Sequence, residues 1–552
     1  MFGIADKCYC TRKMRVLTHV TPMKPIYVPL LILFFSTKSF AQQSVLLEIH
    51  GYGADKTDRI EKHVVYTEDK GVIVKIPSAL GNGGNLPKCH NGVNFYENIF
   101  RKYDSTGTIV WEKCYRPGAF QTDTAILYLY PAENGDFYTL GLYGTGGPSG
   151  GNVKYFLSKE DNNQNILWRG PGYGDINQLT LRAVSRSDDG GFFLAFQSLF
   201  AGGDIAVHYG SAVWLDVWVL KLDSLGNKLW SKTIGGSYDD VVQAVVPTIG
   251  GGCILAGGTG SNDYELTGSH GGSEIFVVKL DSNGNIKWNK LIGGAFDEWC
   301  YDACSNGNEG VLIGGQAMSK DGDVLDHLGQ IGSVNPFVAN IDSSGNLLWG
   351  KCYGIGGNVK ALAKSVDGSI WLTGESIISG RHTDTAFGDG DAWVARISDS
   401  GQFISSIVLG STKEDEGKMI CTLSGGVAMV GGEYKGPGIP PNIFPSNYFG
   451  GPTDIFVAKL APWTTSVETL PPIKYTLAPN PATKTLTIEV SKRPSELFFV
   501  TLINQSGSNV LEKSTWNGAV ARIDISSLPK GSYVLVLEQR GKRSVNEKIL
   551  IQ

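Results

Sequence analysis

The sequence predicts an all-β protein in which a seven-bladed β-propeller, with about 60 residues per blade, precedes a small Ig-like β-sandwich. Two observations predict the propeller. A strand–turn–strand segment recurs about every 60 residues, and a glycine turn followed by an apolar strand recurs between its copies. A third observation, the loss of this period after Trp463, predicts a separate C-terminal domain.

The composition is typical of short strands joined by tight turns. Glycine contributes 72 of the 552 residues, well above the usual share of about 7%. Aromatic residues make up 10% of the chain, which argues against disorder. Charged residues make up only 18%, and the net charge is −5. Because a nucleic-acid-binding protein shows a basic domain or stripe, we expect no nucleic-acid partner.

The repeated segment has the pattern of a β-hairpin: a strand, a short polar turn and a second strand that ends in tryptophan. In each full copy an aspartate opens the turn, where its side chain can accept hydrogen bonds from the backbone of the turn. We therefore interpret this aspartate as structural rather than as a calcium ligand or a catalytic group. The sixth copy lacks the tryptophan and the seventh stops early. The copies are FRKYDSTGTIVW (100–111), FLSKEDNNQNILW (156–168), WVLKLDSLGNKLW (218–230), FVVKLDSNGNIKW (276–288), FVANIDSSGNLLW (337–349), WVARISDSGQFIS (393–405) and FVAKLAPW (456–463).

A second hairpin pattern, the glycine turn with its apolar strand, brings each repeat to about four strands. Four-stranded sheets repeated radially make a β-propeller, and a linear β-solenoid is the alternative. The seventh repeat breaks off at Pro462 before its last strand, and residues 45–51 match the missing strand. We therefore expect the N-terminal strand to close a ring. Residues 42–463 resemble the Trp- and Gly-rich propeller-like repeats of large exported bacterial surface proteins, a resemblance that says little about activity.

The N-terminal region has the layout of a secretory signal peptide. Lys24 precedes an apolar run over 26–35, and small residues at Ser39 and Ala41 complete a cleavage site. We expect residues 1–41 to be the signal peptide, with residues 1–22 a mis-called extension before Met23. The apolar run is shorter than the roughly 20 residues that a membrane span needs, so no transmembrane span is expected.

A Pro/Thr-rich linker (464–474) leads to residues 475–552, where short alternating strands predict the Ig-like sandwich. Four segments, LAPNPA (477–482), INQSG (503–507), DISSLPKGSYVLVL (524–537) and the terminal KILIQ (548–552), resemble the type A C-terminal sorting domain of type IX secretion substrates. An ordinary Ig-like adhesive module is the alternative. The resemblance assigns the sorting motif to Pro479, Asn480, Pro481, Gly507, Leu528, Gly531, Tyr533 and Lys548.

The resemblance implies an address and partners. It implies export to the periplasm by the signal peptide and passage through the outer membrane by the type IX secretion machinery. It also implies removal of the sorting signal by a sortase-like peptidase. The protein would then be secreted or attached to the cell surface.

Long loops and acidic glycine turns are expected to share one face of the propeller. Loops gathered on a rigid scaffold are where binding usually resides. Clustered oxygens there could hold Ca²⁺, although solvated loop acids are the favoured interpretation and no cofactor is required. His270 and His327 occupy equivalent loops, where exposed polar residues are favoured over a metal pair. The candidate binding residues are Asn262, Asp263, Tyr264, Asp321, Asp323, Asp326, His327, Asp384, Asp389 and Asp391.

The sequence contains no G-x-S-x-G elbow, H-E-x-x-H motif, phosphate-binding P-loop or Rossmann fingerprint after a strand, so no catalytic residue is assigned. The favoured interpretation is a non-catalytic binding or adhesion protein with a glycan or protein ligand. The alternative is a secreted hydrolase or lyase acting on glycans. That alternative would require two carboxylates about 5–9.5 Å apart across a pocket, or a buried histidine with a strongly shifted pKa. Seven scattered cysteines from Cys89 onward leave room for one disulfide but form no disulfide framework.

Overall fold

The computed structural model describes residues 45–52, 63–79, 96–115, 125–144, 152–324, 326–378, 390–411, 413–435, 453–461, 475–479, 482–490, 498–503, 509–516, 520–539 and 542–552. These residues form strands, turns and two short 3-10 segments, η1 (Glu133–Gly135) and η2 (Ser424–Gly426). The all-β prediction is therefore confirmed for the described residues. None of their helical segments has the length and hydropathy of a membrane span. The expected signal peptide (1–41) and linker (464–474) lie outside them.

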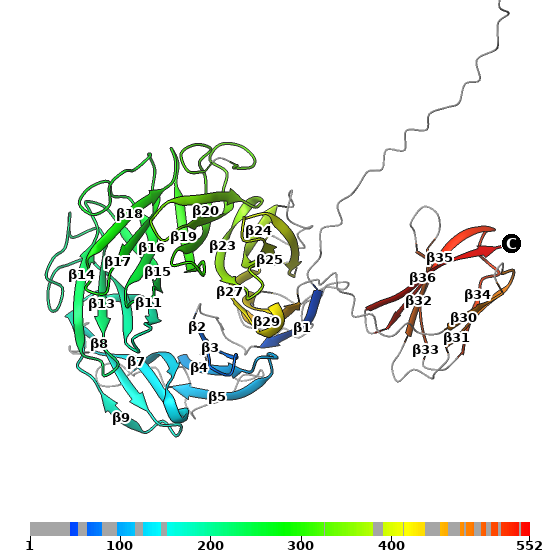
Figure 1. Cartoon of the computed structure of the whole chain (residues 1–552), viewed down its shortest axis with the longest axis horizontal. Coiled ribbons are helices and arrows are strands. Elements are labelled where there is room, and N and C mark those ends of the chain that lie inside the picture. The colour runs from blue at the N-terminus through cyan, green and yellow to red at the C-terminus, as the bar shows by residue number, and fades with distance from the viewer. Residues whose placement is uncertain are drawn as a thin grey trace, which may run out of the picture. The chain divides into compact units, whose positions relative to one another are not determined.

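The described residues between 45 and 461 form seven antiparallel sheets, which follow one another in chain order (Figure 1). The first is β2 (Val64–Tyr66), β3 (Val72–Ala79), β4 (Tyr96–Tyr103) and β5 (Ile109–Tyr115). The second is β6 (Ala125–Pro131), β7 (Phe137–Gly144) and β8 (Val153–Glu160), with β9 (Ile166–Arg169) and β10 (Tyr173–Ile176) both paired to β8. The third is β11 (Thr180–Arg186), β12 (Phe192–Ser198), β13 (Asp216–Leu222) and β14 (Lys228–Ile234).

The next three sheets repeat the four-stranded pattern. They are β15 (Asp240–Pro247), β16 (Cys253–Thr259), β17 (Glu274–Leu280) and β18 (Ile286–Ile292); β19 (Glu298–Ser305), β20 (Val311–Ala317), β21 (Asn335–Ile341) and β22 (Leu347–Cys352); and β23 (Ile355–Lys364), β24 (Ile370–Ile378), β25 (Asp391–Ile397) and β26 (Phe403–Leu409). Where the structure describes their side chains, the two middle strands of each of these three sheets are almost wholly buried, as their largely apolar sequences require.

The last sheet is completed from the other end of the chain. It contains β27 (Glu416–Thr422), β28 (Ala428–Tyr434), β29 (Asp454–Ala461) and β1 (Val45–Tyr52). β1 runs antiparallel to β29, from Val45 opposite Ala461 to Tyr52 opposite Ile455. This is the pairing that the interrupted seventh repeat predicts.

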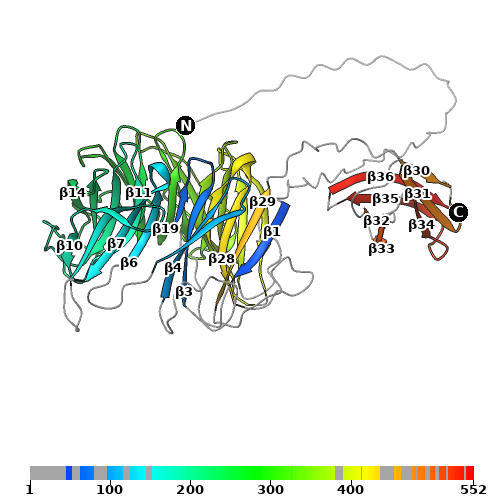
Figure 2. The same ribbon diagram turned by 90° about the horizontal axis from the view of Figure 1, so that it is seen from below.

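Neighbouring sheets meet through their first strands. β11 packs on β15, β15 on β19, β19 on β23 and β23 on β27, and β27 also contacts β2 of the first sheet. The backbone N–H of Thr422 donates to Tyr66 Oη at 3.0 Å across that last junction. The sheets accordingly surround a common centre in Figure 1, and their strands run between the same two faces in Figure 2.

A contact between tryptophan and glycine recurs at the junctions and explains both residues of the hairpin repeat. The indole N–H of Trp288 donates to Ser343 O at 3.0 Å in the next sheet. A Cβ on Gly345 of the same turn would lie 2.9 Å from Trp288 Cδ2, so only glycine fits beneath the ring. The same arrangement joins Trp230 to Ser282 and Gly284, and Trp349 to Asp399 and Gly401.

Residues 475–552 form two further antiparallel sheets around one apolar core. One sheet contains β30 (Tyr475–Ala478), β31 (Thr485–Val490) and β34 (Val520–Asp524). The other contains β32 (Phe498–Ile503), β33 (Asn509–Trp516), β35 (Gly531–Gln539) and β36 (Lys542–Ile551). Leu486, Ile523, Leu535 and Ile549 belong to the buried core that both sheets share.

Candidate binding face

Two kinds of connection lie at the same end of the sheets. In an antiparallel sheet successive connections alternate between the two ends, so loops from a second to a third strand fall on the side of the links between sheets. Hydrogen bonds join the two kinds: Ser237 N–H donates to Asp263 Oδ1, and Ala295 N–H to Asp321 Oδ1, both at 2.8 Å. We call residues 199–215, 235–239, 260–273, 293–297 and 318–334 the loop face. The opposite end, with the short hairpin turns, is the hairpin face.

Asp263 and Asp321 thus have equivalent structural roles. Besides accepting the N–H bond, Asp263 accepts a hydrogen bond from the Ser237 hydroxyl. The backbone of each aspartate also closes a tight turn, in which Leu266 N–H donates to Asp263 O and Val324 N–H to Asp321 O. These carboxylates hold the loops in place, and their oxygens are directed into the loops.

Tyr264 has an unusual backbone conformation. It lies in the left-handed region with φ +50°, where a bulky residue is an outlier. The corresponding turns in the neighbouring sheets carry Gly203 at φ +55° and Gly322 at φ +61°. The Tyr264 side chain is 62% exposed, and its ring lies 4.7 Å from that of Tyr209, centroid to centroid, with 33° between the planes.

Further aromatic side chains are exposed on the loop face. Tyr238 and Phe296 occupy the same position in two successive links and are 54% and 43% exposed. Trp214, 37% exposed, contacts Tyr238 with 5.8 Å between ring centroids. Of these aromatic residues the sequence predicted only Tyr264, because an aromatic in a β-rich sequence is usually a core residue.

The other predicted residues have partners of their own or lie elsewhere. Asn262 Oδ1 accepts from Gly268 N–H at 2.9 Å, and Asp323 forms an ion pair with Lys290 at 3.2 Å. His270 Nδ1 lies 3.2 Å from Glu274 Oε2, and His327 Nε2 lies 2.7 Å from Ser333 O, so each histidine is held within its own loop. Asp326 belongs to the loop of His327. Asp384 and Asp389 lie outside the described residues. Groups of three or more metal-binding side chains do not occur among the residues that the structure describes.

Asp391 is fully buried at the start of β25 and is not exposed on the loop face. Asp391 is one member of a pair of buried acids, and similar pairs occur at other junctions between sheets. The spacing of the sequence motifs did not reveal these pairs. In the best-defined pair, a Cβ on Gly235 would lie 2.1 Å from Asp216 Oδ1 and 3.1 Å from Asp240 Oδ2. Burial raises the pKa of both Asp216 and Asp240 to about 7. Similar pairs are Glu274 with Glu298, around Gly293, and Asp391 with Asp415, near Gly410.

These acids explain the glycines that begin three of the links between sheets, Gly235, Gly293 and Gly410. Asp240 accepts hydrogen bonds from Gly236 N–H at 2.7 Å and from the Ser261 hydroxyl at 3.0 Å. Asp216 Oδ2 accepts from Tyr209 N–H, whereas its Oδ1 has no hydrogen-bond partner among the described residues. A buried carboxylate is costly unless it is well solvated by donors, so the pair tends to retain a proton near neutral pH.

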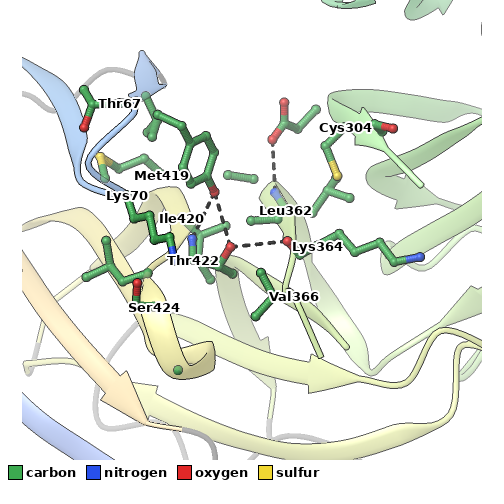
Figure 3. A pocket seen from close by; sticks show the side chains of 18 residues that line it. Thr67, Lys70, Cys304, Leu362, Lys364, Val366, Met419, Ile420, Thr422 and Ser424 are labelled. Carbon is green, nitrogen blue, oxygen red and sulfur yellow. Dashed lines mark hydrogen bonds between the residues drawn. The ribbon is translucent and has the colours of Figure 1, made fainter. Parts of the chain in front are cut away.

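A pocket of about 760 Å³ lies at the centre of the sheets, between β2, β19, β23 and β27 (Figure 3). The turns that contribute to it, around Thr67, Ser305, Val366 and Ser424, place it toward the hairpin face. Its lining is mainly apolar, and Asp302 is the only carboxylate among the described lining residues.

Polar groups of this pocket are bonded to other parts of the fold. Asp302 accepts a hydrogen bond from Leu362 N–H at 3.0 Å, and Lys364 Nζ donates to Asp399 at 2.6 Å. Burial raises the pKa of the Cys304 thiol to about 12, which keeps it from acting as a thiolate nucleophile. The described lining therefore provides neither paired carboxylates nor an activated nucleophile.

A buried histidine with a strongly shifted pKa does occur, but in the core. His63 packs edge-on against the rings of Phe100, Tyr128 and Tyr130, and its Nε2 lies 3.3 Å from Leu129 O. Burial, and then the charge of Lys75, lower the pKa of His63 to about 3. Because His63 does not line the pocket, its neutral ring has a packing role.

Cys114 forms a disulfide bond, whereas Cys253, Cys300, Cys304, Cys352 and Cys421 are free thiols. The partner of Cys114 is not among the described residues. A disulfide is consistent with an oxidising compartment outside the cytoplasm.

The comparison with known families bears on the C-terminal domain. Residues 476–552 match the secretion system C-terminal sorting domain. This match confirms the resemblance to type IX secretion substrates. A sorting domain of this family implies export to the cell surface or the medium. It also implies contact with the secretion machinery.

Within the sorting domain, the motif residues Leu528, Gly531, Tyr533 and Lys548 lie around one turn and the adjoining strands β35 and β36. Tyr533 is buried, and its hydroxyl donates to Pro529 O at 2.7 Å. Leu528 N–H donates to Ile525 O at 3.0 Å, and Lys548 lies opposite Val534 in the pairing of β35 with β36. Gly531 begins β35, and Pro479 follows β30. Asn480, Pro481 and Gly507 lie outside the described residues.

A comparison with curated proteins found no match to the chain. Among solved structures, the chain is similar to a protein of unknown function from Dyadobacter fermentans, with 11% identity over 76% of this chain and 99% of that one and a TM-score of 0.37. It is also similar to a GH43_1 enzyme from Xanthomonas citri complexed with xylose, with 12% identity over 60% of this chain and 94% of that one and a TM-score of 0.27. Likenesses of this strength carry no argument about function.

Proposed function

We propose that this exported protein is a non-catalytic binding protein whose seven sheets are the blades of a closed propeller, and that its loop face contacts a glycan or protein partner. The observation that carries the proposal is the group of exposed aromatic side chains at Trp214, Tyr238, Tyr264 and Phe296. Aromatic side chains with one polar end are enriched where proteins bind partners.

The export route supports this role. The sorting domain takes the protein to a place where extracellular partners are available. We propose that a sortase-like peptidase removes the domain and that the domain itself has an Ig-like sandwich fold. The acids and histidine predicted on the loop face are proposed to support the loops, as the contacts of Asp263 and Asp321 illustrate.

The alternative, a glycan-active hydrolase or lyase, needs a catalytic pair that faces a pocket. Asp302 is the one carboxylate in the described lining of the central pocket. Asp216 and Asp240, whose pKa values are raised to about 7, lie in a junction between sheets. We therefore favour binding over catalysis.

Glycan and peptide arrays probed with the purified, secreted protein test the proposal. The loop-face variant would replace Trp214, Tyr238 and Phe296 with alanine. The matched control would replace Leu225 and Leu348 with alanine. Leu225 lies in a hairpin turn and is 61% exposed, and Leu348 lies beside the next such turn but one, near the start of β22, and is 57% exposed. We expect the loop-face variant to lose binding and the control to keep it. Equal binding by both variants would refute the assignment of the loop face.

A further inference from the structure

The loop face presents its aromatic rings within a negatively charged surface. Its residues include eight carboxylates and a single lysine, Lys320. Such a surface repels anionic ligands such as uronic-acid or sulfated polysaccharides. The carboxylates are Asp204, Asp239, Asp263, Glu265, Asp297, Asp321, Asp323 and Asp326.

Several of these carboxylates are directed into the loops rather than toward solvent. Asp239 accepts from Leu215 N–H, and Asp297 accepts from Ser273 N–H, both at 2.8 Å. Glu265 accepts from the Tyr209 hydroxyl at 2.9 Å. Because these acids are engaged within the loops, the exposed aromatic rings are the groups that we expect to meet a ligand.

Tyr264 is the most unusual of these aromatic residues. A Cβ at Gly203 would lie 1.9 Å from Gly174 O, and a Cβ at Gly322 would lie 2.1 Å from Gly293 O. The turn at Tyr264 must therefore depart from its two counterparts in order to admit a side chain. A bulky residue in a strained conformation where glycine would fit is a pointer to function.

The surroundings of Tyr264 make its ring a platform. Tyr209 lies against one side of it, and the hydrogen bond from Tyr209 to Glu265 fixes the orientation of that supporting ring. The exposed fraction of Tyr264 leaves ring surface accessible to a ligand. The face of an aromatic ring is electron-rich and apolar, and it complements the C–H face of a sugar ring.

We infer that Tyr264, supported by Tyr209, is a stacking platform for a pyranose ring of an uncharged polysaccharide. This inference rests on the proposed function of the loop face and names the class of ligand. It also gives a reason for the left-handed tyrosine, since a turn with glycine would be easier to form but would provide no ring.

The test uses native affinity electrophoresis of the full secreted protein in gels that contain xylan, laminarin, dextran or galactomannan. A gel without polysaccharide is the reference for mobility, and a polygalacturonate gel is the anionic reference. We expect at least one neutral polysaccharide to retard the wild-type protein. Tyr264→Phe, which keeps the ring, should be retarded to a similar extent. Tyr264→Gly should lose at least tenfold in affinity while keeping the wild-type melting temperature, because glycine tolerates the left-handed backbone.

The outcomes separate the inference from the proposed function. Retardation of Tyr264→Gly equal to that of the wild type would overturn the platform and leave the binding face standing. Binding only to a basic peptide on the array, or only to polygalacturonate, would overturn the choice of ligand class. A large drop in the melting temperature of Tyr264→Gly and of Tyr264→Asn would assign the ring a structural role and also overturn the inference.

Discussion

Replacing Gly345 with alanine should destabilise the protein through the contact between tryptophan and glycine at a sheet junction. Gly345 has φ +90°, and an added Cβ would lie 2.9 Å from Trp288 Cδ2. The left-handed backbone costs an alanine about 1–2 kcal/mol. Overpacking against a ring adds about 1–3 kcal/mol. The expected loss in the free energy of unfolding is therefore about 2–5 kcal/mol.

Gly368 provides a matched control in a turn of the same kind. Gly368 has φ +84°, and its N–H donates to Ser365 O. In the same way, Gly345 N–H donates to Asp342 O. An added Cβ at Gly368 would meet no atom within 4 Å. Gly368→Ala should therefore lose only the backbone contribution of about 1–2 kcal/mol.

Urea unfolding followed by far-UV circular dichroism would measure both variants. We expect Gly345→Ala to unfold at a clearly lower urea concentration than Gly368→Ala. In a Trp288→Ala background the difference between the two glycine variants should disappear, because the ring is absent. Equal midpoints for the two variants in the wild-type background would refute the steric role of the tryptophan.

Three further predictions concern other parts of the fold. Asp216→Asn should flatten the dependence of stability on pH. The pKa of Asp216 in the folded protein is raised to about 7, so the free energy of unfolding of the wild type falls as pH rises from about 4 to 7. Between pH 5 and 7 the fall is at most roughly 3 kcal/mol. Urea midpoints at pH 5 and 8 would show a smaller difference for Asp216→Asn, and a pH profile equal to that of the wild type would contradict the prediction. Reduction of the Cys114 disulfide should lower the free energy of unfolding by about 2–4 kcal/mol, and Cys114→Ser should make the protein insensitive to dithiothreitol. Deletion of residues 42–52 should leave the edge of β29 unpaired and promote self-association, which size-exclusion chromatography would detect; a stable monomer would argue against closure by β1.

Local patterns made the hairpins predictable. Asp104 shows the expected turn, because its Oδ1 accepts from the backbone N–H groups of Thr106 and Thr108 at 2.8 and 2.9 Å. Strand and turn patterns depend on residues close together in the chain, and the repeat presents them several times. The pairing of β1 with β29 was also predictable, because one repeat lacks a strand and the N-terminal region resembles it.

Contacts across the junctions were not predictable in the same way. Trp288 and Gly345 are far apart in sequence, and each has a sufficient local explanation as a strand residue and a turn residue. The raised pKa values of Asp216 and Asp240 likewise depend on burial between sheets. The sequence suggested only that acids recur in the glycine turns, and it predicted an exposed position for Asp391, which is buried.

The candidate site likewise has features that the sequence predicted and features that depend on the tertiary structure. By itself the sequence determined the loop-rich face as the region of interest, Tyr264 as a candidate and export through the C-terminal domain. Only the tertiary structure decided that Asp263 supports a loop, that Tyr264 has a left-handed backbone and that Tyr209 lies against its ring. The physical reason is that periodicity records local conformation, whereas exposure, burial and ring stacking arise only when loops from different sheets come together.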